Sequence, residues 1–270
     1  MRDKILLFIP MYNCEKQIVR VLDQLTGEIQ QYLTEIILVN NRSTDHTEEA
    51  AIAKLKELQL PIPAKVLRND ENYGLGGSHK VAFNYAIQNH FDYLIVLHGD
   101  DQGSISDLLP ILRNGEYSTQ DCWLGGRFLK NSKLVGYSKF RIFGNAVFNI
   151  IFSVAIGRKI SDLGAGLNFY AVSMLQSKYY EKFPDNLTFN CYMLFALAAY
   201  QQKYRFFPII WREEDQVSNV KMTKQAWQTL KMAVGYFFGR KRFMLKEARS
   251  TPFENYSSQV VYNTLQEGKS

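Results

Sequence analysis

The stretch from Tyr93 to Ser104 constrains the fold of this chain more than any other part of the sequence. Its first five residues, Tyr93–Leu97, predict a strand that is buried on both faces. Polar residues follow at once, in the order His98-Gly99-Asp100-Asp101-Gln102. Open α/β sheets bind ligands at the carboxyl ends of their strands, and adjacent carboxylates there repel unless a cation or protons lie between them. The stretch therefore predicts a metal and phosphate site, with an ordinary Asp-Gly turn as the alternative.

The elements around this strand alternate as in an α/β protein. Strands are expected at 5–9, 35–39 and 65–67, with helices at 14–29, 46–58 and, after a Gly-rich loop at 72–78, through residue 87. This order predicts a Rossmann-like, mostly parallel sheet flanked by helices. Later in the chain we expect a long apolar helix at 138–156, a strand at 167–172, a helix at 190–200 and one further strand at 205–211.

Positive charge is concentrated at the end of the sequence. Residues 216–270 hold nine Lys and Arg against three Glu, which equals the net charge of +6 of the whole chain. A basic tail is typical of contact with an anionic membrane surface or nucleic acid, and a solubilising helical face is the alternative. No aromatic-basic platform accompanies it, so we do not expect nucleic acid. We divide the chain into an α/β domain, 1–215, and a basic helical C-terminal extension, 216–270.

Membrane contact is expected along the surface and not across the bilayer. A spanning helix needs about 20 apolar residues, and the closest stretch, Ile142–Gly157, includes Gly144, Asn145, Asn149 and Ser153. This stretch is expected on a membrane surface or inside the core. After Ser218, an apolar stripe beside a basic face indicates an interfacial helix, or a helix packed on the domain. Three widely spaced cysteines follow no metal or redox pattern and indicate reduced, cytosolic thiols.

Other phosphate-binding and hydrolytic chemistries lack their patterns. The run Gly74-Leu75-Gly76-Gly77 follows the third expected strand, whereas the dinucleotide fingerprint follows the first strand and has G-x-G-x-x-G spacing. No Walker A sequence and no Gly-x-Ser-x-Gly elbow are present. A dinucleotide-binding function is therefore only weakly indicated by the Gly-rich run.

Polar segments after successive strands carry a resemblance to a known family. They read Ile9-Pro10-Met11-Tyr12-Asn13, then Leu38 through Thr47, then Asn72 through Gly77, then His98 through Gln102, and later Gly125-Gly126-Arg127, Arg141 and Asp162 through Leu167. In this order they resemble the family-2 inverting glycosyltransferases of GT-A fold, in the dolichol-phosphate mannose synthase-like branch that glycosylates polyprenyl phosphates. The resemblance runs from about residue 5 to 221. It implies a GT-A domain, 1–215, followed by the helical extension.

The resemblance also implies a set of site residues. Donor binding would fall to Pro10, Tyr12, Asn40, Asn41, Asn72, Gly74, Gly76, Asp100, Arg127, Arg141, Ser218 and Lys221. A divalent cation, Mn²⁺ or Mg²⁺, would be held by Asp100, then Gln102, then His98. Asp162 and Asp101 are the candidates for catalytic carboxylates.

Three departures from the family pattern leave parts of this assignment open. Asn40-Asn41 stands where Asp-Asp or Asp-Asn is usual, and an amide both accepts and donates, so the identity of the base is open. His98 replaces the first Asp of Asp-x-Asp and is either a ligand or a satisfied buried histidine. Ser218 and Lys221 are spaced more widely than the Ser-Lys pair of the family.

The chemistry follows from the charge of the leaving group. A cation and the side chains of Arg127, Arg141 and Lys221 would stabilise the negative charge that develops on the β-phosphate, unless these are ordinary surface cations. A sugar hydroxyl acceptor needs a base, whereas a polyprenyl phosphate is already ionised near neutral pH. Asp162 would be that base or would position the acceptor, with turn capping as the structural alternative.

The sequence therefore predicts a metal-dependent inverting glycosyltransferase. The donor would be a nucleotide-diphosphate sugar, with UDP favoured and GDP-mannose second, and the acceptor a polyprenyl phosphate or a lipid-linked or surface glycan. We expect a cytoplasmic protein that is peripheral at the inner face of an anionic membrane, and a homo-oligomer is left open. The alternative function is a non-catalytic module that binds nucleotide sugars or membranes.

Overall fold

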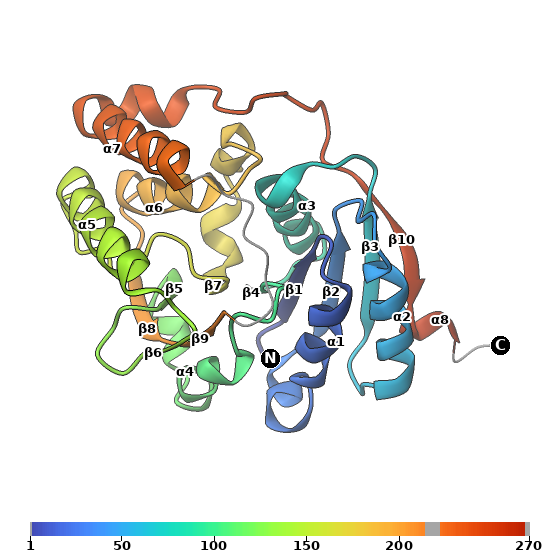
Figure 1. Ribbon diagram of the computed structural model, residues 1–270. Helices are drawn as coiled ribbons and strands as arrows, with labels where there is room; N and C mark the ends of the chain where they lie inside the picture. The colour runs from blue at the N-terminus through green and yellow to red at the C-terminus, as the bar shows by residue number, and fades with distance from the viewer. Residues whose placement is uncertain (1, 214–221, 268–270) are drawn as a thin grey trace.

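A single eight-stranded sheet organises the computed structural model, which describes residues 2–213 and 222–267 (Figure 1). The strand order is β10-β3-β2-β1-β4-β7-β5-β8. These strands are β1 Ile5–Met11, β2 Glu35–Asn40, β3 Ala64–Asn69, β4 Tyr93–Leu97, β5 Cys122–Gly126, β7 Leu167–Ala171, β8 Tyr204–Pro208 and β10 Ser258–Asn263. A small second sheet pairs β6, Lys133–Val135, with β9, Ile210–Arg212.

Helices cover both faces of the large sheet. They are α1 Glu15–Asp23, α2 Thr47–Leu58, α3 Gly74–Gln88, α4 Leu109–Arg113, α5 Lys139–Ile156, α6 Phe189–Ala199, α7 Met222–Leu245 and α8 Thr264–Glu267. Figure 1 shows α1 and α2 together on one side and α3, α6 and α7 on the other. The backbone of α7 is not helical at Gly239, which separates the helix into two parts.

The central strand β1 explains why two layers of helices form. All seven of its residues are buried, and successive side chains of a strand point to opposite faces. Leu6 and Phe8 pack in the core beneath α3 and α6, whereas Ile5, Leu7 and Ile9 pack in the core beneath α1 and α2. An uninterrupted apolar strand therefore needs helices on both faces, as the sequence predicted.

The expected parallel order is confirmed for the first four strands. β1 pairs in parallel with both β2 and β4, and β2 pairs in parallel with β3. β7 is inserted antiparallel between β4 and β5, and β10 is antiparallel to β3. The sheet is therefore mostly parallel. The antiparallel direction of β7 and β10 could not be predicted from the sequence, because a run of apolar residues does not indicate the direction of a strand.

Two expected elements are divided in the structure. The helix expected at 14–29 ends at Asp23 and is followed by a 3₁₀ turn, Gly27–Tyr32, in which Gly27 has a φ of 71°. The strand expected at 205–211 is two strands, because Ile209 leaves the large sheet and β9 then pairs with β6. This second division carries the chain from β8 to Arg212 at the edge of the site.

The C-terminal extension packs closely against the rest of the chain. Tyr236 of α7 is fully buried and stacks on Phe195 of α6, with ring centroids 4.4 Å apart. Beyond α7 the chain crosses above α3 and returns along the sheet edge as β10 (Figure 1). The domain boundary at residue 215 stays a prediction, because it falls within residues 214–221, which are outside the described part.

Candidate active site

Three segments that follow strands, and one that precedes the antiparallel strand β7, meet at one edge of the sheet. The amide of Gly99 donates to the carbonyl of Pro10 at 3.1 Å, and the amide of Asn41 donates to the carbonyl of Met11 at 2.9 Å. The amide of His98 donates to the carbonyl of Gly166, also at 2.9 Å. The structure therefore brings together the polar segments that the sequence placed after β1, β2 and β4. Tyr12, which is half exposed, lies at the surface of this edge.

The two asparagines after β2 are buried and fixed by hydrogen bonds. Asn40 donates from Nδ2 to Glu48 Oε2 at 2.7 Å and accepts from the amide of Ser43 at 2.9 Å. Asn41 donates from Nδ2 to Asn72 Oδ1 at 2.8 Å. Both amide nitrogens therefore donate to acceptors of the protein. Both carbonyl oxygens accept, that of Asn40 from Ser43 and that of Asn41 from the backbone amide of Tyr73 and from Asn69 Nδ2.

The Gly-rich run begins a helix instead of forming a loop. α3 starts at Gly74, which has a φ of 70°. A Cβ atom at Gly74 would lie 2.4 Å from the carbonyl oxygen of Asp185, and one at Gly76 would lie 2.4 Å from that of Pro184. These glycines allow the helix start to pack against residues 184–185, so the structure gives them a packing role beside the Asn41–Asn72 pair.

The acidic loop after β4 is electrostatically strained. Burial raises the pKa of Asp100 to about 6, and the nearby carboxylates of Asp101 and Glu213 act in the same direction. Burial lowers the pKa of His98 to about 4, so its imidazole is neutral. The Nε2 atom of His98 is buried and has no hydrogen-bonding partner among the described residues. A cation beside Asp100 would stabilise its charged carboxylate. A metal ion or a hydrogen-bond donor beside His98 would give its Nε2 atom a partner.

The available ligands fit a hard divalent cation that is shared with a substrate. Carboxylate and amide oxygens of Asp100 and Gln102 suit Mg²⁺ or Mn²⁺, and neutral imidazole suits Mn²⁺. Within residues 2–213 and 222–267, no three His, Cys, Asp or Glu side chains form a complete metal cage. Mg²⁺ commonly binds through one or two carboxylates together with substrate phosphates. The residues present fit that kind of site.

Asp101 faces the helix α1. Its backbone has a φ of 59°, and its carboxylate accepts from Arg20 Nε at 2.6 Å and from Gln24 Nε2 at 2.9 Å. Gln24 also accepts from the amide of Ile105 at 3.1 Å. These contacts anchor the turn that presents Asp100, and they place Asp101 as a support of the loop.

Asp162 forms a buried ion pair with Arg127. Its carboxylate accepts from Nε, Nη2 and the backbone amide of Arg127 at 2.7–2.8 Å, and from the amide of Gly164 at 3.1 Å. Burial would lower the pKa of Arg127, but the charge and hydrogen bonds of Asp162 outweigh burial and raise it. A carboxylate that accepts four hydrogen bonds is poorly placed to take a further proton.

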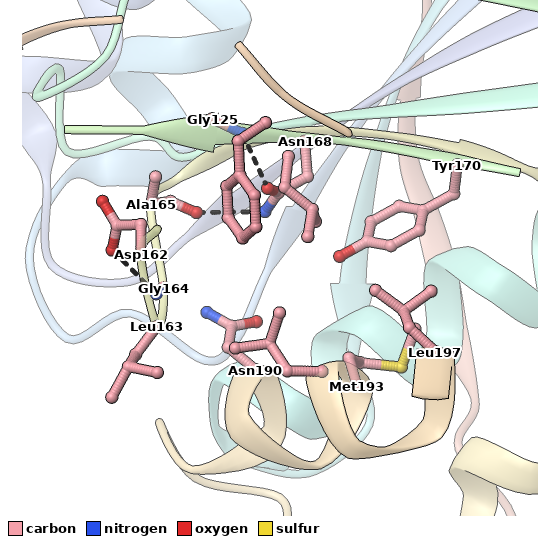
Figure 2. Close-up of a pocket in the computed structure, with 13 residues that line it drawn as sticks. Gly125, Asp162, Leu163, Gly164, Ala165, Asn168, Tyr170, Asn190, Met193 and Leu197 are labelled. Atoms are coloured by element: carbon pink, nitrogen blue, oxygen red, sulfur yellow. Dashed lines mark hydrogen bonds between the residues drawn. The ribbon is translucent and has the colours of Figure 1, made fainter. Parts of the chain in front are cut away.

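A small cavity lies behind Asp162, between the strand ends and α6 (Figure 2). Asn168, Asn190 and Tyr170 contribute its polar groups, and its volume of about 20 Å³ is room for about one water. Figure 2 shows Asn168 bound to the backbone of Gly125 and Ala165. A sugar does not fit there, so the cavity supports the Asp162 turn and is not the substrate site.

Arg141, in the first turn of α5, belongs to the same edge. It forms an ion pair with Glu213, and its guanidinium lies 4.5 Å from the centre of the Tyr137 ring. Arg127 approaches the same tyrosine, from Nη1 to the hydroxyl at 3.4 Å. The structure thus brings both predicted arginines to Tyr137. Ser218 and Lys221 lie outside the described residues.

Sequence reasoning missed three residues of this site. Glu48 fixes Asn40, Tyr137 joins the two arginines, and Glu213 links Arg141 to the surroundings of Asp100. Glu48, Tyr137 and Glu213 lie eight, ten and 72 positions along the sequence from a residue of the site that each contacts. Only Glu213 had a signal, because it lies two residues after the last predicted strand.

Comparison with solved structures supports the same fold. The structure resembles glucosyl-3-phosphoglycerate synthase from Mycobacterium tuberculosis in complex with Mn²⁺, UDP and phosphoglyceric acid, with a TM-score of 0.61, 13% identity and coverage of 97% of this chain and 89% of that one. It also resembles residues 1–349 of S. aureus TarS in complex with UDP-GlcNAc, with a TM-score of 0.56, 15% identity and coverage of 89% and 70%. The predicted GT-A fold is confirmed.

Comparison of sequences identifies the family. A dolichol-phosphate mannosyltransferase from Pyrococcus furiosus is 27% identical over 141 residues, which are 51% of this chain and only 37% of that relative's length. The model of glycosyl transferase family 2 matches residues 7–184, which is most of the chain and includes every strand from β2 to β7. The motifs, the fold and this match agree, and the chain belongs to glycosyl transferase family 2.

Proposed function

We propose that this protein is an inverting glycosyltransferase that moves a sugar from a nucleotide-diphosphate sugar to a polyprenyl phosphate or a lipid-linked glycan. The observation that carries the proposal is the meeting of an acidic loop and two arginines at one sheet edge. The backbone amide of Arg212 donates to the carbonyl of Gln102 at 2.9 Å, and the next residue, Glu213, pairs with Arg141, which supports the proximity of the two groups. A UDP-sugar is our first choice of donor and GDP-mannose the second.

A divalent cation would be held by Asp100 and Gln102, with His98 beside them. When bound, it would neutralise charge on the donor diphosphate. Hydrogen bonds from Arg20 and Gln24 hold the Asp101 carboxylate against the end of α1, so Asp101 has a positioning role in this proposal. Two of the similar solved structures are complexes with UDP-GlcNAc or with Mn²⁺ and UDP, which supports this choice of donor and cation.

The state of Asp162 favours a phosphate acceptor over a sugar hydroxyl. Its oxygens are saturated by Arg127 and Gly164, so we assign it to fixing Arg127 and not to proton abstraction. A phosphate needs no base, and arginine forks bind phosphate oxygens well. Arg141 could take this role when the acceptor replaces its partner Glu213. The similarity to a dolichol-phosphate mannosyltransferase supports the same acceptor class.

The exposed face of α5 supports work at a membrane surface. Phe140, Phe143, Val147, Ile150 and Val154 recur every three or four residues and are all exposed. α5 has the length and composition of a membrane-crossing helix, a test that buried helices of soluble proteins also pass. Because its N-terminal turn carries Arg141 into the site, we propose that α5 lies along the surface.

The neighbouring helix α7 extends this apolar face. Trp227, Phe237 and Phe238 of α7 are also exposed. Cys14, Cys122 and Cys191 are free thiols, as a reducing cytoplasmic compartment would keep them, and we therefore place the protein at the cytoplasmic face of the membrane in this proposal.

Calorimetry with UDP, GDP and CDP, each with and without Mn²⁺, tests the donor. We expect UDP to bind most tightly and Mn²⁺ to increase its affinity. Asp100→Asn should lower donor turnover by about 100-fold or more, since one charge-stabilising group is commonly worth that much. Asp23→Asn, at an exposed carboxylate that pairs with Lys54, is the matched control and should leave turnover unchanged.

Binding of none of the three nucleotides would overturn the proposal. Unchanged turnover in Asp100→Asn would remove the metal assignment alone. Nucleotide binding without any turnover towards lipid phosphates or glycans would favour a non-catalytic module.

A further inference from the structure

We propose that the segment from Phe253 to Asn263, here called the C-terminal strap, positions the donor-binding asparagines through Tyr73. The inference rests on the proposed function for the identity of the donor site. The strap lies outside residues 7–184, the part that matches the family. It comprises a turn of aromatic residues and the edge strand β10.

The strap holds Tyr73 from the outside. The Tyr73 ring lies 4.8 Å from that of Phe253 and 5.3 Å from that of Tyr256, both in edge contacts. The amide of Ser257 donates to the Tyr73 hydroxyl at 3.4 Å. The Ser257 side chain donates to Asp70 Oδ2 at 2.5 Å, and its carbonyl accepts from the Asp70 amide at 3.2 Å. The strap thus binds both the ring of Tyr73 and the chain just before it.

On its inner side, Tyr73 is hydrogen-bonded to Asn41, one of the asparagines predicted to bind the sugar donor. Its amide donates to Asn41 Oδ1 at 2.9 Å, and Asn69 Nδ2 donates to the same oxygen at 3.0 Å. Asn41 in turn donates to Asn72 Oδ1, which also accepts from the amide of Gly74. A shift of Tyr73 would therefore change the orientation of Asn41 and Asn72 together.

A buried lysine anchors the strap. Lys80 is fully buried, and its Nζ donates to the carbonyl of Phe183 and to Asp185 Oδ1, both at 2.6 Å, and to the Tyr256 hydroxyl at 3.0 Å. The Tyr256 hydroxyl donates to Asp185 at 2.8 Å. A buried ammonium is tolerated only where its donors are satisfied, so Tyr256 is held tightly. Asp185 also accepts from the amide of Gly76 through its carbonyl, at 2.7 Å.

Edge protection alone would explain β10 but not the aromatic turn. An added antiparallel strand covers the exposed edge of β3 whatever its side chains are. The contacts to Tyr73, Asp70 and Lys80 come instead from residues before β10, and all three are directed at the start of α3. They connect the strap to the donor side of the sheet edge.

The test compares Tyr256→Ala with Tyr262→Ala. Tyr262 lies in β10 opposite Val66 and over Lys56, away from Tyr73, so its loss weakens the same strand without reaching the site. We expect Tyr256→Ala to raise the dissociation constant for UDP with Mn²⁺ about tenfold and to raise the KM for the donor, with kcat changed less than about twofold. In the free protein, amide hydrogen exchange at Tyr73 and Gly74 should accelerate. Tyr262→Ala should change none of these.

Equal loss of UDP affinity in both variants, or no change of exchange at Tyr73 in Tyr256→Ala, would overturn the proposal. If Tyr256→Ala does not fold, Tyr256→Phe and Ser257→Ala remove single hydroxyl groups and should show smaller changes in the same direction. If the wild-type protein binds no nucleotide, the proposed function fails, whereas exchange at Tyr73 still decides whether the strap controls the asparagine cluster.

Discussion

Glu48 explains how an asparagine can stand where the family usually has an aspartate. The Asn40 side chain donates to Glu48, which also pairs with Arg68. Hydrogen bonding to Arg68 lowers the pKa of Glu48 although burial opposes it, so this carboxylate is charged at neutral pH. An aspartate at position 40 would place a second carboxylate against it with no proton to share. The amide at position 40 and the carboxylate at position 48 therefore act as a pair.

We expect Asn40→Asp, the residue type usual in the family, to destabilise this chain. Loss of the buried hydrogen bond and repulsion from Glu48 should lower the free energy of unfolding by about 1–3 kcal/mol at pH 7. Urea denaturation of Asn40→Asp, Glu48→Gln and the double variant completes a double-mutant cycle. The double variant should be more stable than the sum of the single changes predicts, because a new amide then donates to a new carboxylate. Additive effects would show that the two side chains are not coupled.

The sequence predicted residues of the site that directly follow buried strands. His98, Asp100 and Asn41 were identified because polar groups after an apolar strand stand out. The contacts that define their roles could not be identified in the same way. Glu48 reaches Asn40 across a turn, and Glu213 reaches Arg141 across 72 residues. Such partners depend on the assembled sheet edge and not on any local pattern.

At the scale of elements, α5 was predicted within one residue at its start, but its exposed face was not. Its residues are apolar nearly all round, so the sequence could not distinguish the side that packs on α7 from the side that faces outwards. The structure makes that distinction, because Phe152 is buried whereas Phe143 is 68% exposed. β10 was not predicted, since its six residues have little hydrophobic pattern and gain their place by pairing with β3.

We expect the exposed face of α5 to govern membrane binding. Phe143→Ser and Ile150→Ser should each reduce sedimentation with anionic vesicles by about tenfold or more, because burying such a side chain contributes about 1.5–3 kcal/mol. Leu265→Ser is the matched control, since Leu265 is similarly exposed but lies on α8, at the opposite edge of the sheet (Figure 1). Equal binding of all three variants and the wild-type protein would exclude α5 as the membrane surface.

At the scale of the whole molecule, the C-terminal extension contributes to the core of the preceding domain. Ala233 and Tyr236 of α7 are buried among residues of α6, and Phe243 stacks on Tyr192 with ring centroids 4.8 Å apart. The extension then supplies β10 to the sheet. The predicted boundary rested on the charge of residues 216–270. Charge describes the surface of a protein and does not indicate which apolar side chains of two segments pack in one common core.

We therefore expect residues 1–221 alone to fail to fold cooperatively. Removing a buried aromatic side chain typically costs about 3–5 kcal/mol, and loss of Tyr236 and Phe243 together approaches the whole stability of about 5–15 kcal/mol of a typical domain. Thermal unfolding followed by circular dichroism should show a broad or absent transition. A chain that stops after Asn263 retains α7 and β10 and should melt nearly as the full chain does. If residues 1–221 instead melted cooperatively at the temperature of the full chain, the boundary at residue 215 would separate two independent domains.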